Sequence, residues 1–276
     1  MNRSDSPASV RATLNYSADN GRRLDTYFYE PDADTVRNPP GTDPREVTIV
    51  NGWPRAAQCS ADREGFEIAE FDGRFQDFDD DAAIRARFHA QVVAHVKRHT
   101  GARRVVVFDH TIRRRMPADD LSLQTTVQRP AVLLVHSDYT VKSGPQRVRD
   151  LLPDEAEALL ARRVAFYNVW KPLARRVEEL PLAVCDASSQ SPDDLLLMDL
   201  KYRERTGEIY VMRSAPGHRW VYFPQMEASE ALLLKTYDSE TDGRARFMFH
   251  SAFEDPTTPP DALKRESIEV RTMAFF

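Results

Sequence analysis

Short apolar runs, alternating or continuous, dominate this sequence and predict strands. Alternation of apolar and polar residues favours a half-buried strand, and a short continuous apolar run favours a fully buried one. The segments between the runs are rich in proline and aspartate, which is typical of turns. Strands are predicted over residues 11–17, 24–29, 47–50, 103–108, 131–140, 164–170, 182–185, 208–213, 220–223, 232–237, 246–253 and 268–276.

Two stretches have helical periodicity instead. The longer spans about residues 80–100, where apolar residues recur every fourth position, aspartates precede the run and Gly101 follows it. A shorter helical pair is predicted over 146–152 and 154–162, separated by Pro153. Many short strands with helices outside them predict a mainly β fold with flanking helices, either a sandwich, a barrel or a jelly roll.

No repeat or low-complexity linker divides the chain, so we expect one domain over residues 1–276, with residues 1–10 as a flexible arm. The 38 basic residues are interspersed among 43 acidic ones and the net charge is −5, which argues against a nucleic-acid partner. Two cysteines are too few for a disulfide scaffold, so a reduced cytoplasmic setting is expected. No signal region or membrane-spanning run is present, and no glycine-rich phosphate loop supports a nucleotide or S-adenosylmethionine site.

The most informative chemistry is the His136-Ser137-Asp138 segment at the end of the apolar run 131–135. Side chains alternate along a strand, so His136 and Asp138 are expected to point to the same side. An imidazole and a carboxylate side by side are two of the three ligands of a 2-His-1-carboxylate site for non-heme Fe(II). The alternatives are Zn²⁺, which the same ligand types accept, and a hydrogen-bonded pair at a strand end.

Three histidines could complete this site: His110, His218 and His250. His250 lies inside the next-to-last predicted strand, whereas His218 lies in a turn and is also a candidate for a substrate or outer contact. Arg265 and Ser267 share one face at the start of the last strand. A guanidinium with a neighbouring hydroxyl suits a carboxylate held at two points, and Arg271 is its rival for that role.

Further candidates lie on the other predicted strands. Asn168 and Trp170 share the inward face of 164–170, and a polar group on an apolar face needs a partner. Trp170 is more typical of a core residue than of a substrate platform. Tyr139 and Lys235 are weaker candidates for cofactor or substrate contacts, and His110 ends an apolar strand where it could line the mouth of the site.

The sequence from about residue 105 onward resembles the Fe(II)/2-oxoglutarate-dependent oxygenase superfamily. It is most similar to the oxidoreductase family of the cephamycin C7-hydroxylase component and the gibberellin-desaturase-like enzymes. The resemblance lies in seven segments: His136–Thr140, Tyr167–Pro172, Pro181–Asp186, His218–Trp220, Lys235–Ser239, His250–Phe253 and Arg265–Arg271.

The resemblance implies a jelly-roll core, a cupin-like double-stranded β-helix, over about residues 103–276. It implies that His136, Asp138 and His250 bind Fe(II), and that the co-substrate 2-oxoglutarate chelates the iron and places its distal carboxylate on Arg265 and Ser267. With O₂, such an enzyme releases CO₂ and succinate and hydroxylates or desaturates a small molecule, most often in secondary metabolism. A His/Asp metal-dependent hydrolase and a non-catalytic partner subunit are the rival hypotheses, and a partner subunit or a homo-oligomer is also open.

Overall fold

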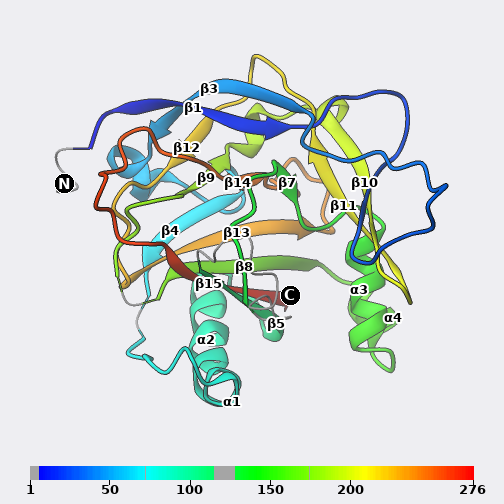
Figure 1. Cartoon of the computed structure of the whole chain (residues 1–276). Coiled ribbons are helices and arrows are strands. Elements are labelled where there is room, and N and C mark those ends of the chain that lie inside the picture. Colours follow the sequence, from blue (N-terminus) through cyan, green and yellow to red (C-terminus); the bar gives the residue numbers. More distant parts are fainter. Residues whose placement is uncertain (1–5, 72, 115–127, 174) are drawn as a thin grey trace.

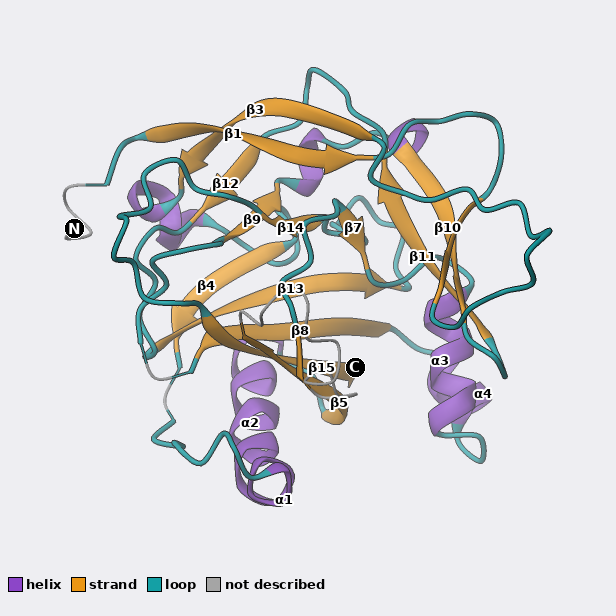
Figure 2. Cartoon of the chain, viewed as in Figure 1, coloured by secondary structure: helices purple, strands orange, loops and turns teal. Residues whose placement is uncertain are grey.

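The computed structural model describes residues 6–71, 73–114, 128–173 and 175–276, which form two β-sheets with helices outside them (Figures 1 and 2). The larger sheet has the strand order β1-β3-β12-β9-β14-β7-β11-β10-β2, and the smaller has the order β4-β13-β8-β15-β5-β6. The mainly β fold with a jelly-roll core is confirmed. The strands are β1 (Ser9–Tyr16), β2 (Leu24–Tyr27), β3 (Asp43–Asn51), β4 (Phe66–Glu70), β5 (Arg104–Arg114), β6 (Gln128–Arg129), β7 (His136–Ser137), β8 (Val164–Pro172), β9 (Leu182–Cys185), β10 (Leu195–Lys201), β11 (Thr206–Met212), β12 (Trp220–Tyr222), β13 (Glu230–Asp238), β14 (His250–Ala252) and β15 (Glu266–Phe275).

The strand β8 lies in the middle of the smaller sheet, and all nine of its residues are buried. Trp170 packs with Leu182 and Val184 in the core between the sheets. The alternate residues Tyr167 and Val169 pack instead in the cluster that includes residues of the helix on the outer face. Burial on both faces explains why 164–170 is a continuous apolar run rather than an alternating one.

The predicted helix over 80–100 is confirmed, and it contains a π-helical turn. It consists of α1 (Asp81–Ala83), a π-helical segment (Ile84–Phe88) and α2 (His89–Thr100). The Asp80 carboxylate accepts a hydrogen bond from the Ala83 amide at 3.0 Å, and Gly101 ends the helix at φ 71°. The helix contacts β5, β8 and β15 and covers the outer face of the smaller sheet (Figure 1).

The predicted helical pair is confirmed as α3 (Ser143–Leu151) and α4 (Ala156–Leu160). Val148 and Ala156 pack in a cluster with Phe166 of β8 and Tyr139. None of the described helices is both long enough and apolar enough to span a bilayer.

The predicted strand over 131–140 is wrong except at residues 136–137. Before β7, Leu134 makes a single bridge to Asn15, and Leu133 is exposed. After β7, Asp138 leaves the ladder and a turn at Thr140 leads into α3. Val132 and Leu134 line a cleft, and Leu134 also packs against a core cluster with Met198, so this run is apolar for a reason other than strand pairing.

The predicted strand over 246–253 is likewise shorter, because residues 246–249 pass from one sheet toward the other. The Met248 amide donates to the Lys235 carbonyl in β13 at 3.0 Å, and only β14 joins the larger sheet. Strands β4, β6 and β10 were not predicted.

The expected flexible arm over residues 1–10 is corrected at its end, since Ser9 and Val10 already pair with β3; residues 1–5 lie outside the described residues. The core also begins before residue 103, because β1, β2 and β3 belong to the larger sheet and β4 to the smaller one. Strands β1 and β2 form the two edges of the larger sheet, and β4 forms one edge of the smaller sheet. The extent of a single domain over 1–276 stays a prediction.

Candidate metal centre and its cleft

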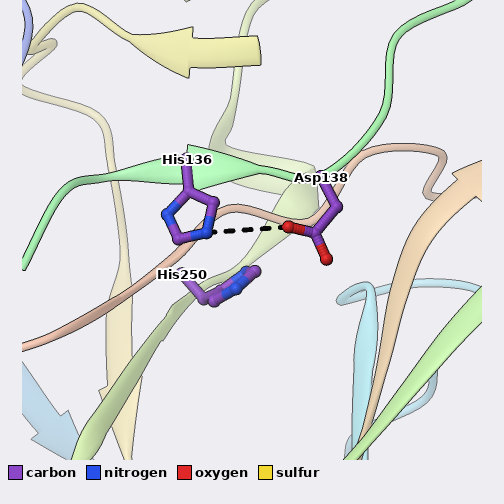
Figure 3. A group of neighbouring side chains, drawn as sticks. All are labelled: His136, Asp138 and His250. Carbon is purple, nitrogen blue, oxygen red and sulfur yellow. Dashed lines mark ion pairs between the residues drawn. The ribbon is translucent and has the colours of Figure 1, made fainter. Parts of the chain in front are cut away.

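The candidate metal centre is built on a cross-strand pair. Strand β7 pairs with β14 so that His136 lies directly opposite His250. Opposite residues in an antiparallel pair point to the same face, and their Cβ atoms are about 5 Å apart. The two imidazole centroids are 4.4 Å apart. Asp138 follows β7 immediately, and its Oδ1 is 3.7 Å from His136 Nε2 (Figure 3).

One ligand atom from each of these three residues lies within 4.8 Å of the others, and they are the one such group in the described part of the chain. His136 Nδ1 is 2.8 Å from the Leu134 carbonyl oxygen, which can only accept, so Nδ1 holds the proton and Nε2 keeps its lone pair. Burial lowers the pKa of His250 to about 4, and the neighbouring His136 acts in the same direction. The His250 ring is therefore neutral near neutral pH, as metal ligation requires.

Asp138 is ionised and anchored. Burial would raise its pKa, but Arg271, the two imidazoles and a hydrogen bond from Asn168 outweigh burial and lower the pKa well below its usual range. Asn168 Nδ2 is 2.6 Å from Asp138 Oδ2, and Arg271 Nε is 3.3 Å from the same oxygen. The predicted inward direction of Asn168 is thus observed, and its partner is the acid of the candidate metal centre.

Glu269 is the residue of this network that sequence reasoning missed. It is 4% exposed and accepts from Asn168 Nδ2 at 2.7 Å, and its Oε1 is 3.1 Å from Arg271 Nη2. Asn168 and Arg271 therefore bridge two carboxylates, Asp138 and Glu269. The alternation along β15 is the signal that could have found it, because residues 267, 269 and 271 share one face.

Arg265 and Ser267 lie together at the start of β15, as predicted. Arg265 Nε donates to Ser267 Oγ at 3.2 Å, Nη1 donates to the Leu180 carbonyl, and the guanidinium is 5.3 Å from the centre of the Trp170 ring. Burial, together with the nearby Arg113, lowers the pKa of Arg265 to about 9. Two guanidinium groups in a buried space favour an anion between or beside them.

A cleft of about 1120 Å³ opens beside the three ligands. Its walls come from β5, the segment before β7, α3, and the β10–β11 hairpin. His136, Asp138, Tyr139 and Arg271 line it near the candidate metal centre. Arg271 does not stand free in this space, because it also donates to Asp109 and Thr111 at 3.1 Å each.

The structure does not bring His218 to the candidate metal centre. The register places His136, His250 and Val184 on one face of the larger sheet, and Cys185 and Trp220 on the opposite face. His218 joins the Trp220 side: its Nδ1 is 3.1 Å from the Tyr16 hydroxyl, and its Nε2 is 3.1 Å from Asp194. Both ring nitrogens have partners there, which corrects His218 as an alternative ligand.

Two more candidates lie on the outer face of the smaller sheet. His110 Nδ1 is 3.2 Å from His89 of α2, and its Nε2 is 3.1 Å from Asp81, so it points away from the cleft that Asp109 lines. Lys235 forms ion pairs with Asp62 and Asp238. Alternation along β5 and β13 turns both side chains outward, which corrects them as contacts of the site.

The residues present fit a divalent iron. Two neutral imidazoles and one ionised carboxylate on one side, with a cleft on the other, are the donor set of an open 2-His-1-carboxylate site. In addition, His250 Nδ1 is buried and has no hydrogen-bond partner among the described residues. A buried unpaired nitrogen is unfavourable unless another group satisfies it.

Comparisons with known proteins agree with this geometry. The family model described as an oxidoreductase/YMDC permease-like domain matches residues 14–275. The hydroxylase/desaturase efuI of Hormonema carpetanum is 30% identical over 79% of this chain and 79% of its own length. The Fe(II)/2-oxoglutarate-dependent dioxygenase nvfI of Aspergillus novofumigatus is 35% identical over 71% of this chain and 69% of its own. The solved iron and alpha-ketoglutarate-dependent endoperoxidase NvfI superposes with a TM-score of 0.88 at 27% identity, covering 98% of this chain and 99% of that one.

Proposed function

This chain belongs to the family of Fe(II)/2-oxoglutarate-dependent oxygenases, and from that premise we propose that it oxidises a small molecule of secondary metabolism. In this proposal His136, Asp138 and His250 bind Fe(II). The single observation that carries the assignment is the direct pairing of His136 with His250 across two strands, with Asp138 beside them.

The chain's own residues have separate tasks. Asn168 and Arg271 hold the Asp138 carboxylate ionised and fixed, with Glu269 behind them. Arg265 and Ser267 bind the distal carboxylate of 2-oxoglutarate. Arg265 is preferred over Arg271 for this task, because its Nη2 makes no hydrogen bond within the described residues whereas the Arg271 guanidinium contacts three carboxylates. The bound Fe(II), 2-oxoglutarate and O₂ supply the oxidising chemistry.

Hydroxylation is the expected outcome, and desaturation uses the same bound components. The named relatives include hydroxylase/desaturases and an endoperoxidase, so the family supports more than one outcome. None of these names supports a hydrolase or a non-catalytic subunit. A cytoplasmic location stays part of the proposal, in keeping with two free cysteines, Cys59 and Cys185.

The proposal is tested by anaerobic titration of the purified protein with Fe(II) and 2-oxoglutarate. We expect a metal-to-ligand absorption band near the visible, followed by succinate formation when O₂ is admitted. The His136→Ala variant should show neither signal, whereas His95→Ala, at a buried histidine of α2, should show both. Activity of a zinc-loaded protein without O₂ or 2-oxoglutarate would contradict the proposal and favour the hydrolase.

A further inference from the structure

The cleft beside the candidate metal centre carries more positive charge than its surroundings. The whole chain has a net charge of −5, but seven arginine and lysine side chains and five carboxylates line this cleft. Most of them are paired with one another. Arg23 bridges Asp199 and Glu208, and Lys201 also binds Asp199.

Two of the cleft's cations that have no carboxylate partner among the described residues belong to α3 or to the residue just before it. Arg271 is engaged by Asp138 and Asp109, and Arg113 reaches Glu269 at 3.7 Å. That leaves three basic side chains of the lining with no carboxylate partner among the described residues, namely Lys142, Arg147 and Arg205. Among the residues that the structure describes, Asp150 is the one lining acid without a cationic partner, and it accepts a hydrogen bond from Gln146. Lys142 immediately precedes α3, Arg147 lies in the middle of this helix, and both line the same cleft as His136 and Asp138.

Arg147 is half-buried and fixed in orientation. Its guanidinium carbon is 5.3 Å from the centre of the Phe108 ring, which also lines the cleft. A guanidinium stacked on an aromatic face keeps its N–H edge free for a planar anion. Phe108 packs on Phe166, and Tyr139 packs on the same ring with centroids 4.7 Å apart. Contacts through Phe108 and Phe166 therefore connect Arg147 with Tyr139, the residue that follows Asp138.

The chain links α3 rigidly to Asp138. The Thr140 amide donates to Ser143 Oγ at 2.9 Å, and the Lys142 and Ser143 amides donate to Thr140 Oγ1 at 3.1 and 3.0 Å. This closed turn lies between Asp138 and the first turn of α3. The turn thus fixes the position of Lys142 and Arg147 relative to Asp138. A group that orients a substrate needs such a fixed position.

We infer that the substrate is a carboxylate, and that Arg147 and Lys142 bind its carboxylate group while Phe108 and Tyr139 contact its apolar body. This inference rests on the proposed function and names the substrate class of the same cleft. An apolar surface with two cations on one side binds an amphiphilic anion better than its neutral analogue, because charge-assisted hydrogen bonds are about twice as strong as neutral ones. Arg147 and Lys142 are then specificity residues of the oxygenase.

The test uses the anaerobic Fe(II)–2-oxoglutarate complex and two flat probes, 2-naphthoate and its neutral analogue 2-naphthamide. Calorimetric titration should give a dissociation constant roughly 10-fold lower for the carboxylate. Arg147→Gln should abolish this preference and Lys142→Gln should reduce it. Arg149→Gln is the matched control, since Arg149 lies on the same helix, is exposed and pairs with Glu157; it should keep the full preference.

The absorption band of the complex separates the possible failures. Absence of the band in the wild-type protein would contradict the proposed function, whereas a band with equal affinity for both probes, or no binding of 2-naphthoate, would overturn this inference alone. Loss of the band on adding 2-naphthoate would place the probe on the co-substrate site and would also overturn it. Tighter binding of 2-naphthyl phosphate would overturn the assignment of a carboxylate. If Arg147→Gln disturbs folding, the exposed Lys142→Gln position still decides the outcome.

Discussion

Two pairs of neighbouring histidines in this molecule have almost the same ring spacing, yet they have different chemistry. The imidazole centroids of His136 and His250 are 4.4 Å apart, and those of His95 and His99 in α2 are 4.3 Å apart. The first pair stands at the mouth of a cleft with an anchored carboxylate beside it. The second lies one helical turn apart, with His95 packed on Phe71 and His99 bound to Glu67 at 2.6 Å.

The comparison shows that two close imidazoles do not define a metal centre. At His136 and His250 the third donor converges with the other two, and Arg271 and Asn168 keep it ionised. At His95 no third donor converges among the described residues, and both of its ring nitrogens are buried without a partner. The acid and its network make the difference.

The largest expected effect comes from removing a ligand of the first pair. His250→Ala or Asp138→Ala should abolish the Fe(II)–2-oxoglutarate absorption band at concentrations that saturate the wild-type protein, a loss beyond the roughly 100-fold caused by losing an outer partner. His95→Ala and His99→Ala should leave the band in place. An absorption band that persists in His250→Ala would contradict the assignment of His250 as a metal ligand.

A smaller effect is expected from the network that anchors Asp138. Asn168→Ala and Arg271→Gln remove donors that hold its Oδ2, so Fe(II) affinity should fall about 10- to 100-fold in an anaerobic titration. Without Arg271 the pKa of Asp138 should also rise, which moves the acid limit of iron binding to higher pH. Equal iron affinity in Arg271→Gln and in the control Arg104→Gln would show that the network does not contribute to iron binding.

The next expected effect concerns the binding of 2-oxoglutarate by Arg265 and Ser267. Arg265→Gln should weaken 2-oxoglutarate binding roughly 30-fold, the order expected for a lost charge-assisted hydrogen bond, with little change in iron affinity. The dissociation constant is read from the absorption band as 2-oxoglutarate is added at saturating Fe(II). A larger loss in Arg271→Gln than in Arg265→Gln would assign the anion to Arg271 instead.

The smallest effect concerns stability and the second pair. Burial, with smaller contributions from His99 and Arg98, lowers the pKa of His95 to about 4. Between about pH 6.5 and pH 4, the unfolded chain therefore binds a proton at this imidazole that the folded chain does not bind. His95 therefore lowers the free energy of unfolding of the protein as the pH falls from 6.5 toward 4. His95→Phe should remove about 2 kcal/mol of this destabilisation at pH 5. Chemical unfolding of the metal-free wild-type and His95→Phe proteins at pH 5 and at pH 7 measures it, and the stability difference due to this proton should be much smaller at pH 7.

Sequence reasoning found the three ligands because their residue types and order restrict the chemistry, and found Arg265 and Ser267 because alternation places them on one face. It failed for His110, Lys235 and His218, since a single sequence gives the spacing of side chains along a strand but not which face meets the cleft. The register of β12 with β9, and the helix over β5, settle those faces. The strand expected at 131–140 failed for a related reason, as apolar residues that line a cleft have the same pattern as buried ones.

The sequence by itself determined the secondary-structure class, the long helix with its caps, the ligand types and the family, because these depend on local periodicity and on short motifs. Tertiary structure alone decided that His136 faces His250, that Glu269 contacts Asn168 and Arg271, and that Arg147 lines the cleft. Each of these depends on pairing between segments far apart in the chain, where the free energy of packing and hydrogen bonding, and not local preference, selects the register.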